Sequence, residues 1–506
     1  MIQKFILFGF VFLVGKSQAQ LQNNNWTIGY GARVNFSGAN PVASMSSINS
    51  NEATASVSDP VTGQLLFYTD SRNVWNANNQ VMPNGANLLG GFFTSSTQGA
   101  LIVPFPNDNQ RYYIFTLDEL EVDPSNPVAD DGLRYCVVDM TLNGGLGDVQ
   151  TSTMNMQLAT DLTEKLIVIR SPEIQGFWVI AHRRNANEFL AWKIDACGVN
   201  PQPVVSAVGS NFAPITSIGA NEGWAGAMDA SPDGNRIGMP VDYSTRLEFF
   251  DFNKLTGVVS NPLNVNVTDD ATAPFLRKYG ACFSPDGSKF YYTNTNSVYQ
   301  LDLSTYNSAA IASSHTLIHS TLFQPIGFPC FQIEQAPNNK LYIAVGNAPT
   351  IDEISNPNAL GLACGYVPGA VNLAPGVCQL GLPAQVPLGG FAACEIASPC
   401  DNLELGDPIS ACLNDTIQLN ADLSSFQNIV GVEWIGDGTF LPSGTVPNPL
   451  YVPSQSENNA GSATVTLNVS LPPPAAIPTG LLAYDHSSDD LLFYVDAVSG
   501  SVDSIQ

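Results

Sequence analysis

The sequence has little positive charge. Its 506 residues include 18 Lys and Arg against 44 Asp and Glu, which gives a formal net charge of −26. Nucleic acids and anionic membrane surfaces attract basic proteins, so this balance argues against both as partners. An acidic surface is compatible with divalent cations, but solubility is the simpler reason for it.

The common catalytic and metal-binding motifs are also missing. The sequence contains no HExxH, GxSxG or GxxxxGK[ST] segment and no CxxC pair, which removes the usual signals of zinc sites, serine hydrolases and phosphate-binding loops. His315 and His319 are four residues apart, but no helix is indicated that would place both on one face. We therefore predict no catalytic residue and no metal ligand.

A long hydrophobic run occurs only at the start of the chain. Residues 5–14 are apolar and follow Lys4, and Ser17-Gln18-Ala19 is a small-x-small cleavage site. About ten apolar residues are too few to cross a bilayer. The pattern predicts a signal peptide at residues 1–19, an exported protein at an extracellular or outer-membrane surface, and no membrane insertion.

A repeated turn is the strongest positive signal. The tetrapeptide SPDG occurs at Ser231–Gly234 and at Ser284–Gly287, each time between apolar strands, and looser copies bring the number of units to six. Ser, Pro and Gly at these positions are typical of a type I turn in a β-hairpin. The units recur roughly every 45 to 65 residues, a period typical of propeller blades. An array of β-sandwiches with accidental similarity is the alternative.

These features predict an all-β chain with a six- or seven-bladed β-propeller (WD40- or YVTN-like) at residues 20–398. A seventh blade would fit between Gly132 and Thr163, and the strand near Trp26 is expected to complete the last blade. The strand pattern of residues 399–471 predicts an immunoglobulin- or PKD-like β-sandwich around Trp434. A Pro-rich linker at 472–480 and a partial β unit at 481–506 follow.

Nine cysteines are an odd number for an oxidising compartment. Cys136, Cys197 and Cys282 fall within strand patterns, which predicts buried free thiols. The denser group from Cys364 to Cys412 lies near the domain junction, where one or two disulfides are plausible. The connectivity does not follow from the spacing.

Several long segments resemble a known family. They are NEATASVSDPVTGQLLFYTDSRNVWNANNQVMPNG (51–85), STQGALIVPFP (96–106), LRYCVVDMTLNGGLGDV (133–149) and ISNPNALGLACGY (354–366). They are similar to exported Bacteroidetes β-propeller proteins that carry immunoglobulin- or PKD-like repeats and a type IX secretion sorting domain. The resemblance implies this architecture and a cell-surface location, although no sorting domain is visible. It implies no particular activity.

Candidate binding residues come from the aromatic side chains. Trp75 and Trp224 lie beside apparent loops and are the predicted binding rim. Strand packing between blades explains Tyr112, Tyr113, Trp178 and Trp192 without a ligand. The acidic run 117–132 lacks the spacing of a calcium loop, so we predict no cofactor and leave calcium as an option without a motif.

The resulting functional prediction is a secreted or cell-surface binding or adhesion protein that is not an enzyme. Its propeller face would recognise an extracellular protein or glycan, and the immunoglobulin-like module would be a spacer. A glycan-active propeller enzyme and a structural element of a longer extracellular protein are the alternatives. A cluster of carboxylates with one Arg or His at the axial mouth would favour an enzyme, and Asn, Ser and aromatic groups would favour a binder.

Overall fold

The computed structural model describes most of the chain. The described residues are 21–106, 108–119, 131–212, 223–242, 244–269, 278–294, 296–321, 330–385, 416–419, 431–446, 448–460, 464–470, 479–485 and 490–496. The predicted signal peptide lies outside these residues, as does most of the predicted linker. No helix within them is long and apolar enough to cross a membrane.

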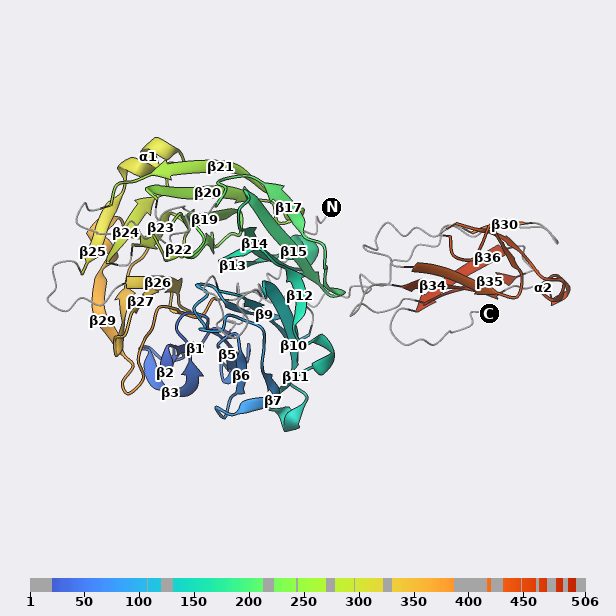
Figure 1. Cartoon of the computed structure of the whole chain (residues 1–506), viewed down its shortest axis with the longest axis horizontal. Coiled ribbons are helices and arrows are strands. Elements are labelled where there is room, and N and C mark those ends of the chain that lie inside the picture. Colours follow the sequence, from blue (N-terminus) through green and yellow to red (C-terminus); the bar gives the residue numbers. More distant parts are fainter. Residues whose placement is uncertain are drawn as a thin grey trace, which may run out of the picture.

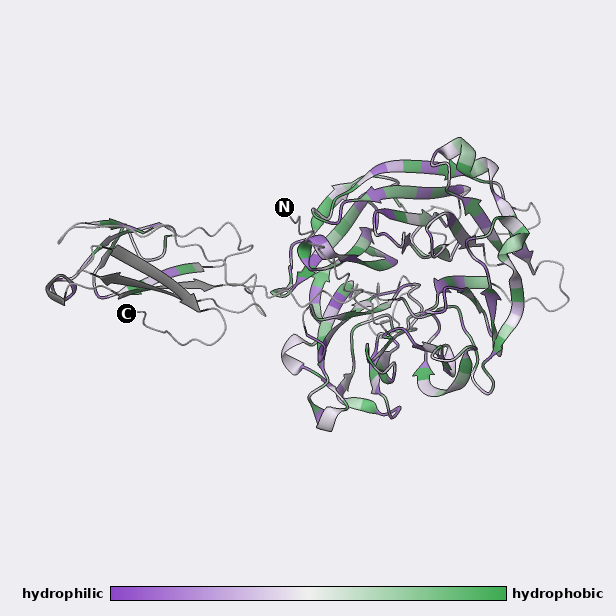
Figure 2. Cartoon of the chain, turned by 180° about the vertical axis from the view of Figure 1, so that it is seen from behind, coloured by the Kyte–Doolittle hydropathy of each residue, from purple (hydrophilic) through white to green (hydrophobic). Residues whose placement is uncertain are grey.

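The described part of residues 25–372 forms seven antiparallel sheets that stand around one axis like the blades of a propeller (Figure 1). The predicted all-β propeller is therefore confirmed, with seven blades. Along the strands, hydrophobic and hydrophilic residues alternate over short distances (Figure 2), as expected where each sheet packs against its neighbours. The helices that the structure describes within these blades are short: α1 (Ser308–Ser313) and four 3₁₀ turns, Asn143–Gly145, Thr151–Thr153, Pro172–Ile174 and Gly361–Cys364.

The first three blades come from the N-terminal third of the chain. Blade 1 has β1 (Asn25–Ile28), β2 (Tyr30–Asn35) and β3 (Val42–Asn49). Blade 2 has β4 (Ala55–Ser58), β5 (Leu65–Thr69), β6 (Asn73–Asn76) and β7 (Val81–Ala86). Blade 3 has β8 (Ala100–Pro104), β9 (Arg111–Leu117), β10 (Leu133–Asp139), β11 (Asp148–Val149) and β12 (Met156–Ala159).

The remaining four blades repeat the same order of strands. Blade 4 has β13 (Leu162–Ser171), β14 (Gly176–Arg183), β15 (Glu188–Asp195), β16 (Gly198–Val199) and β17 (Val204–Ala207). Blade 5 has β18 (Asp229–Ala230), β19 (Arg236–Pro240), β20 (Arg246–Phe252) and β21 (Val259–Asn266). Blade 6 has β22 (Ala281–Phe283), β23 (Lys289–Thr293), β24 (Ser297–Asp302) and β25 (Thr316–Ser320). Blade 7 has β26 (Cys330–Gln335), β27 (Leu341–Val345), β28 (Thr350–Ile354) and β29 (Tyr366–Asn372).

The seventh blade is not where the sequence suggested. Residues 133–159 supply strands of blade 3 and β13 of blade 4 begins at Leu162, while the N-terminal strands form a blade of their own instead of completing the last one. The ring closes when the chain returns from blade 7 to blade 1. There the backbone N–H of Tyr30 donates to the Val377 carbonyl at 2.8 Å, and Val377 donates back to Tyr30 at 3.0 Å. The neighbouring Gly29 has φ +51°, and a Cβ there would lie 2.2 Å from the Val377 oxygen.

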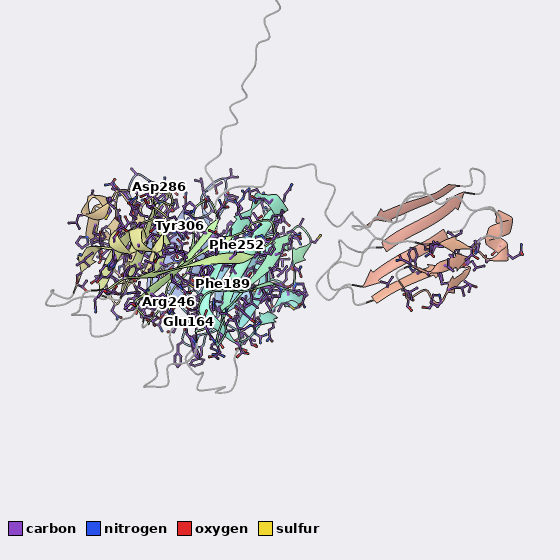
Figure 3. All side chains as sticks on the ribbon, turned by 90° about the horizontal axis from the view of Figure 1, so that it is seen from above. Glu164, Phe189, Arg246, Phe252, Asp286 and Tyr306 are labelled. Carbon is purple, nitrogen blue, oxygen red and sulfur yellow. The ribbon has the colours of Figure 1, made fainter. Side chains whose placement is uncertain are left out.

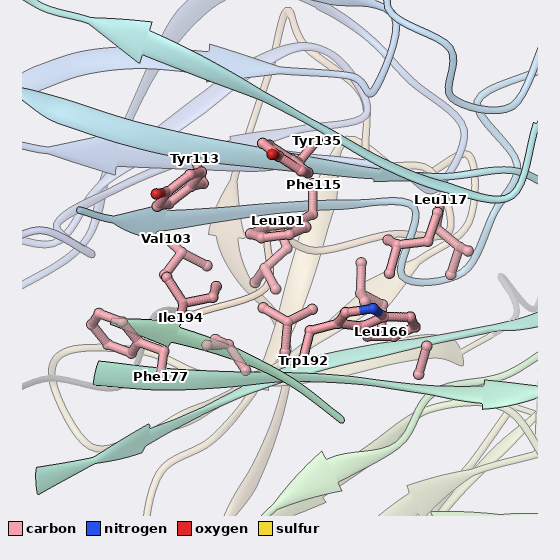
Figure 4. Close-up of a cluster of buried hydrophobic side chains, with 14 of the residues drawn as sticks. Leu101, Val103, Tyr113, Phe115, Leu117, Tyr135, Leu166, Phe177, Trp192 and Ile194 are labelled. Atoms are coloured by element: carbon pink, nitrogen blue, oxygen red, sulfur yellow. The ribbon is translucent and has the colours of Figure 1, made fainter. Parts of the chain in front are cut away.

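Apolar side chains fill the seams between blades. Between blades 3 and 4, Tyr113 and Phe115 face Phe177, Trp192 and Ile194 (Figure 4). Tyr112, Tyr113, Trp178 and Trp192 are all buried, as their predicted strand positions require. Close packing of this kind makes the stability of the propeller sensitive to single methyl groups.

Replacing Ile194 by Val is expected to lower the free energy of unfolding by about 1 kcal/mol, because it removes one methyl group from a fully buried site. Urea denaturation followed by circular dichroism measures the change. Val61 is 67% exposed, so Val61→Ala should shift the free energy by less than about 0.5 kcal/mol. Equal effects of the two substitutions would contradict the packing described for this seam.

The C-terminal part forms two further sheets. One contains β30 (Ile417–Gln418), β33 (Leu450–Val452) and β32 (Thr439–Leu441), and the other contains β31 (Gly431–Gly436), β34 (Thr464–Ser470), β35 (Thr479–Asp485) and β36 (Asp490–Asp496). A short helix, α2 (Gln455–Ala460), precedes β34. Trp434 is 3% exposed, as predicted. The predicted partial β unit, β35 and β36, extends the sheet of β34, and the immunoglobulin-like assignment stays a prediction.

The cysteine predictions are partly correct. Cys136 and Cys282 are buried free thiols, as expected. Cys197 is disulfide-bonded, so the prediction of a free thiol there is wrong. Within the denser group, Cys364 and Cys378 are buried and free, and its other members lie outside the described residues.

Candidate functional site

The repeated turns gather at one end of the propeller axis. Figure 3 views the propeller edge-on, with Asp286 of an SPDG turn at one end and Glu164 and Arg246 toward the other. In that turn Ser284 Oγ donates to Asp286 Oδ1 at 2.8 Å, and Gly287 has φ +70°. The turn residues thus have the conformation that the sequence pattern predicts, and they define what we call the turn end of the axis.

One position just before each turn differs between blades. It is two residues before the first residue of the turn, and in blades 2, 3 and 4 it holds the buried apolar residues Val57, Val103 and Ile169. In blades 5, 6 and 7 it holds Asp229, Cys282 and Glu334. Equivalent positions in neighbouring blades lie side by side around the axis. Three consecutive blades therefore bring two carboxyl groups and one thiol together.

These three residues line a pocket on the axis at the turn end. Its volume is about 400 Å³, and its walls come from β8, β13, β18, β22 and β26, with further residues from the segment before β8 and from residues 384–385. Apolar Leu101 and Leu166 share the lining with several amides, among them Gln98 and Gln335. A pocket of this size and mixed lining suits a small polar molecule.

Gln98 joins three blades beside this pocket. Its Oε1 accepts from the backbone N–H of Leu166 at 3.1 Å and of Met228 at 3.0 Å, and its Nε2 donates to the Met228 carbonyl at 2.9 Å. The side chain is 5% exposed. A buried amide with all of these bonds fixes the inner strands of blades 3, 4 and 5 relative to one another.

Asp229 bridges blades 5 and 6. Its Oδ2 accepts from the backbone N–H of Phe283 at 2.7 Å, and its Oδ1 accepts from that of Ala230 at 2.8 Å. The side chain is only partly exposed. Burial raises the pKa of Asp229 from 3.8 to about 7, although these hydrogen bonds work in the opposite direction. Both ionisation states of Asp229 are therefore populated near neutral pH.

Glu334 is the second carboxyl group of the pocket. Its Oε1 accepts from Gln332 Nε2 at 2.9 Å. Burial, and then the charge of Asp229, raise the pKa of Glu334 well above its ordinary value. Burial and the same two carboxyl groups raise the pKa of Cys282. The pocket thus holds two carboxyl groups whose pKa values are raised by burial, together with a thiol that is neutral at neutral pH and is therefore not a nucleophile.

A second buried polar group lies at the other end of the inner strands. Thr97 Oγ1 donates to Glu164 Oε2 at 2.7 Å, and the hydroxyl of Tyr279 contacts both Thr97 and Glu52. Lys165 is fully buried and donates to the Ala225 and Gly226 carbonyls at 2.8 and 2.7 Å. These bonds tie blades to one another. Within the described residues, no group of three or more His, Cys, Asp or Glu side chains could hold a metal ion.

The predicted binding rim is buried. Trp75 is 7% exposed and stacks on Tyr68 with ring centroids 5.3 Å apart. Trp224 is 9% exposed, donates from Nε1 to the Phe212 carbonyl and has the Arg184 guanidinium 5.2 Å from its ring. Neither residue lines the axial pocket. A binding role for either stays a prediction, and the packing of both rings does not support it.

His315 and His319, which the sequence places four residues apart, contact different side chains. His315 follows α1, and its Nε2 lies 2.7 Å from the Tyr292 hydroxyl. His319 lies on β25 and stacks on Tyr366 with ring centroids 4.2 Å apart. Each ring is held by aromatic neighbours, which explains both residues structurally.

Comparison with known proteins adds information on the fold only. No family model and no curated protein matches the sequence. A protein of unknown function from Desulfotomaculum acetoxidans is similar in structure, with 14% identity, a TM-score of 0.42 and coverage of 72% of this chain and 100% of that one. A candidate 6-phosphogluconolactonase from Bacteroides uniformis has 13% identity, a TM-score of 0.42 and coverage of 71% and 98%. The periplasmic gluconolactonase of Pseudomonas aeruginosa has 11% identity, a TM-score of 0.41 and coverage of 71% and 99%.

These findings correct the functional prediction. Propellers that resemble this one in fold include proteins named as lactonases, so a non-catalytic adhesion protein does not follow from the architecture. The pocket lining contains the groups expected for an enzyme, namely the carboxyl groups of Asp229, Asp233 and Glu334 with Arg170, alongside the amides of Asn23 and Asn339. We therefore reject the prediction of a non-catalytic binding or adhesion protein, while the prediction about individual site residues stays untested; the chain has a β-propeller fold.

Proposed function

We propose that the chain is an exported enzyme that hydrolyses a small, hydroxyl-rich ester in the axial pocket, with sugar lactones as the first substrate class. The observation that carries this proposal is the pair of Asp229 and Glu334, which line one pocket and have raised pKa values. Two carboxyl groups that share a site titrate apart, so that one donates a proton while the other accepts one. The signal peptide predicted at residues 1–19 supports export.

The reaction needs one base and one acid. The Asp229 carboxylate takes a proton from water as the water oxygen forms a bond to the ester carbonyl carbon. The ring C–O bond then breaks, and the Glu334 carboxylic acid gives its proton to the leaving oxygen. The product is a hydroxy acid, and transfer of the proton from Asp229 to Glu334 restores the starting state. Each turnover consumes one water molecule and no other co-reactant.

The lining of the pocket favours a hydroxyl-rich substrate. Side-chain amides from different parts of the ring line the pocket, namely those of Asn23, Gln335, Asn339 and Gln385. Amides both donate and accept hydrogen bonds, which matches the hydroxyl groups of a sugar-derived ring. Leu101 and Leu166 supply apolar surface for the ring carbons. The lactonase names among similar folds suggest the first compound to test and carry no further weight.

The test measures acid release from D-glucono-1,5-lactone by the full chain, above the spontaneous rate. We expect saturable hydrolysis, and slower hydrolysis of δ-valerolactone, which has no hydroxyl groups. Glu334→Gln removes the acid and should lower kcat/KM about 100-fold. Glu188 pairs with Arg183 at 2.8 Å in blade 4, outside the pocket lining, so Glu188→Gln should leave kcat/KM unchanged. An unchanged kcat/KM in Glu334→Gln, or no hydrolysis of any lactone, would overturn the proposal.

A further inference from the structure

We propose that Gln332 is a positioning residue that fixes the acid Glu334 and ties it to the closure of the propeller ring. The catalytic effect of Gln332 rests on the proposed hydrolysis, whereas its contact with Glu334 does not. Gln332 does not line the pocket. It acts on the reaction only through Glu334.

The amide of Gln332 can take only one orientation. Its Oε1 accepts from the backbone N–H of Leu382 at 2.9 Å, and its Nε2 donates to Glu334 Oε1 at 2.9 Å. A backbone N–H can only donate, so the oxygen of the amide must face Leu382 and the NH₂ must face Glu334. Gln332 is 1% exposed, which leaves water little access to replace either bond.

The segment that holds Gln332 is itself fixed from the other side. The backbone N–H of Gln332 donates to the Leu380 carbonyl at 3.2 Å, and Leu380 N–H donates to the Asn51 carbonyl at 2.8 Å. A Cβ on Gly381 would lie 1.8 Å from the Glu52 carbonyl oxygen. Residues 380–382 are thus wedged between blade 7 and the start of blade 2. The position of Glu334 therefore depends on contacts that exist only when the ring is closed.

The bond from Gln332 stabilises the ionised form of Glu334. A donated N–H bond favours the carboxylate, so Gln332 opposes the rise that burial and Asp229 impose on the pKa of Glu334. The other titratable group that reaches Glu334 is Cys282 of β22, and Arg170, Asp233 and Lys254 are the charged residues elsewhere in the lining. Gln332 thus keeps the acid able to release its proton during turnover.

The test uses Gln332→Met in the full chain, with the titration of Glu334 followed by carboxyl ¹³C NMR, which needs no substrate. Loss of the N–H should raise the midpoint by about one pH unit, a tenfold change in proton affinity. Gln300 is a matched control, because it is 1% exposed and donates from Nε2 to Tyr291 in blade 6. Gln300→Met should leave the Glu334 midpoint unchanged.

The same variants separate this inference from the proposed function. If lactone hydrolysis occurs, Gln332→Met should lower kcat with little change in KM and should move the alkaline limb of the pH profile upward. A raised midpoint without lactone hydrolysis would keep the positioning role and reject the substrate class. An unchanged midpoint in Gln332→Met, or an equal shift in Gln300→Met, would overturn the positioning role.

Discussion

Asp229→Asn is expected to lower kcat/KM for the proposed hydrolysis about 1,000-fold and, at pH 8, to make the protein more stable. The activity falls because the amide cannot accept a proton from the attacking water. The stability rises because loss of hydration around the partly exposed Asp229 raises its pKa from 3.8 to about 7 on folding. A change of this size corresponds to roughly 4 kcal/mol of unfavourable ionisation in the folded state, of which Asn would recover a part.

The gain in stability from Asp229→Asn is expected to depend on pH. A carboxyl group with a raised folded-state pKa destabilises the protein as pH rises, because the unfolded chain ionises at lower pH than the folded chain. The gain from Asp229→Asn should therefore be small near pH 4 and full above about pH 7. Urea unfolding of both proteins at pH 4.5 and at pH 8 measures it. Such a residue, kept at a cost in stability, is typical of functional sites.

Asp286→Asn is a control for which the change in stability at pH 8 should have the opposite sign. It occupies an SPDG turn in blade 6 and is exposed. Burial alone would raise its pKa, but hydrogen bonds from Ser288 and Ser284 outweigh burial and hold the pKa of Asp286 below its ordinary value. Asp286→Asn should therefore lose stability at pH 8 and keep the hydrolytic activity. A gain in stability for Asp229→Asn that did not depend on pH would contradict the burial of its charge.

The sequence predicted the fold well because its signal is local. Each SPDG turn is formed by four adjacent residues, and the strands on either side show their alternation directly. The blade count was less accessible, because blade 1 lacks the turn motif and closes through Val377, far along the chain. Counting turn motifs therefore misses blade 1.

The site was harder to predict because it depends on contacts between blades. Asp229 bonds to Phe283, 54 positions away, and Gln332 to Leu382, 50 positions away. One signal was nevertheless present: with the repeats aligned on their turns, a position that is aliphatic in blades 2 to 4 holds Asp, Cys and Glu in blades 5 to 7. Trp75 and Trp224 were chosen because loops follow or precede them, but large aromatic rings at blade seams are buried by packing.

Gly381→Ala is expected to lower the free energy of unfolding by about 3 to 5 kcal/mol. Its Cβ would lie 1.8 Å from the Glu52 carbonyl oxygen and 2.5 Å from the carbonyl carbon. Both atoms belong to the backbone, so no side chain can move aside to make room, and the closing segment must shift away from blade 2. Chemical denaturation of the full chain, followed by circular dichroism at the propeller transition, measures the loss.

The matched control separates ring closure from the ordinary effect of replacing glycine. Gly38 lies in a turn of blade 1, where a Cβ would approach only the Asn40 carbonyl, at 3.4 Å, so Gly38→Ala should change the free energy by less than about 1 kcal/mol. Because residues 380–382 also hold Gln332, Gly381→Ala should raise the titration midpoint of Glu334 in the protein that remains folded. A stable Gly381→Ala variant with an unchanged Glu334 midpoint would show that the axial pocket forms without the closing contact, and the acid would then have to be fixed by blade 7 alone.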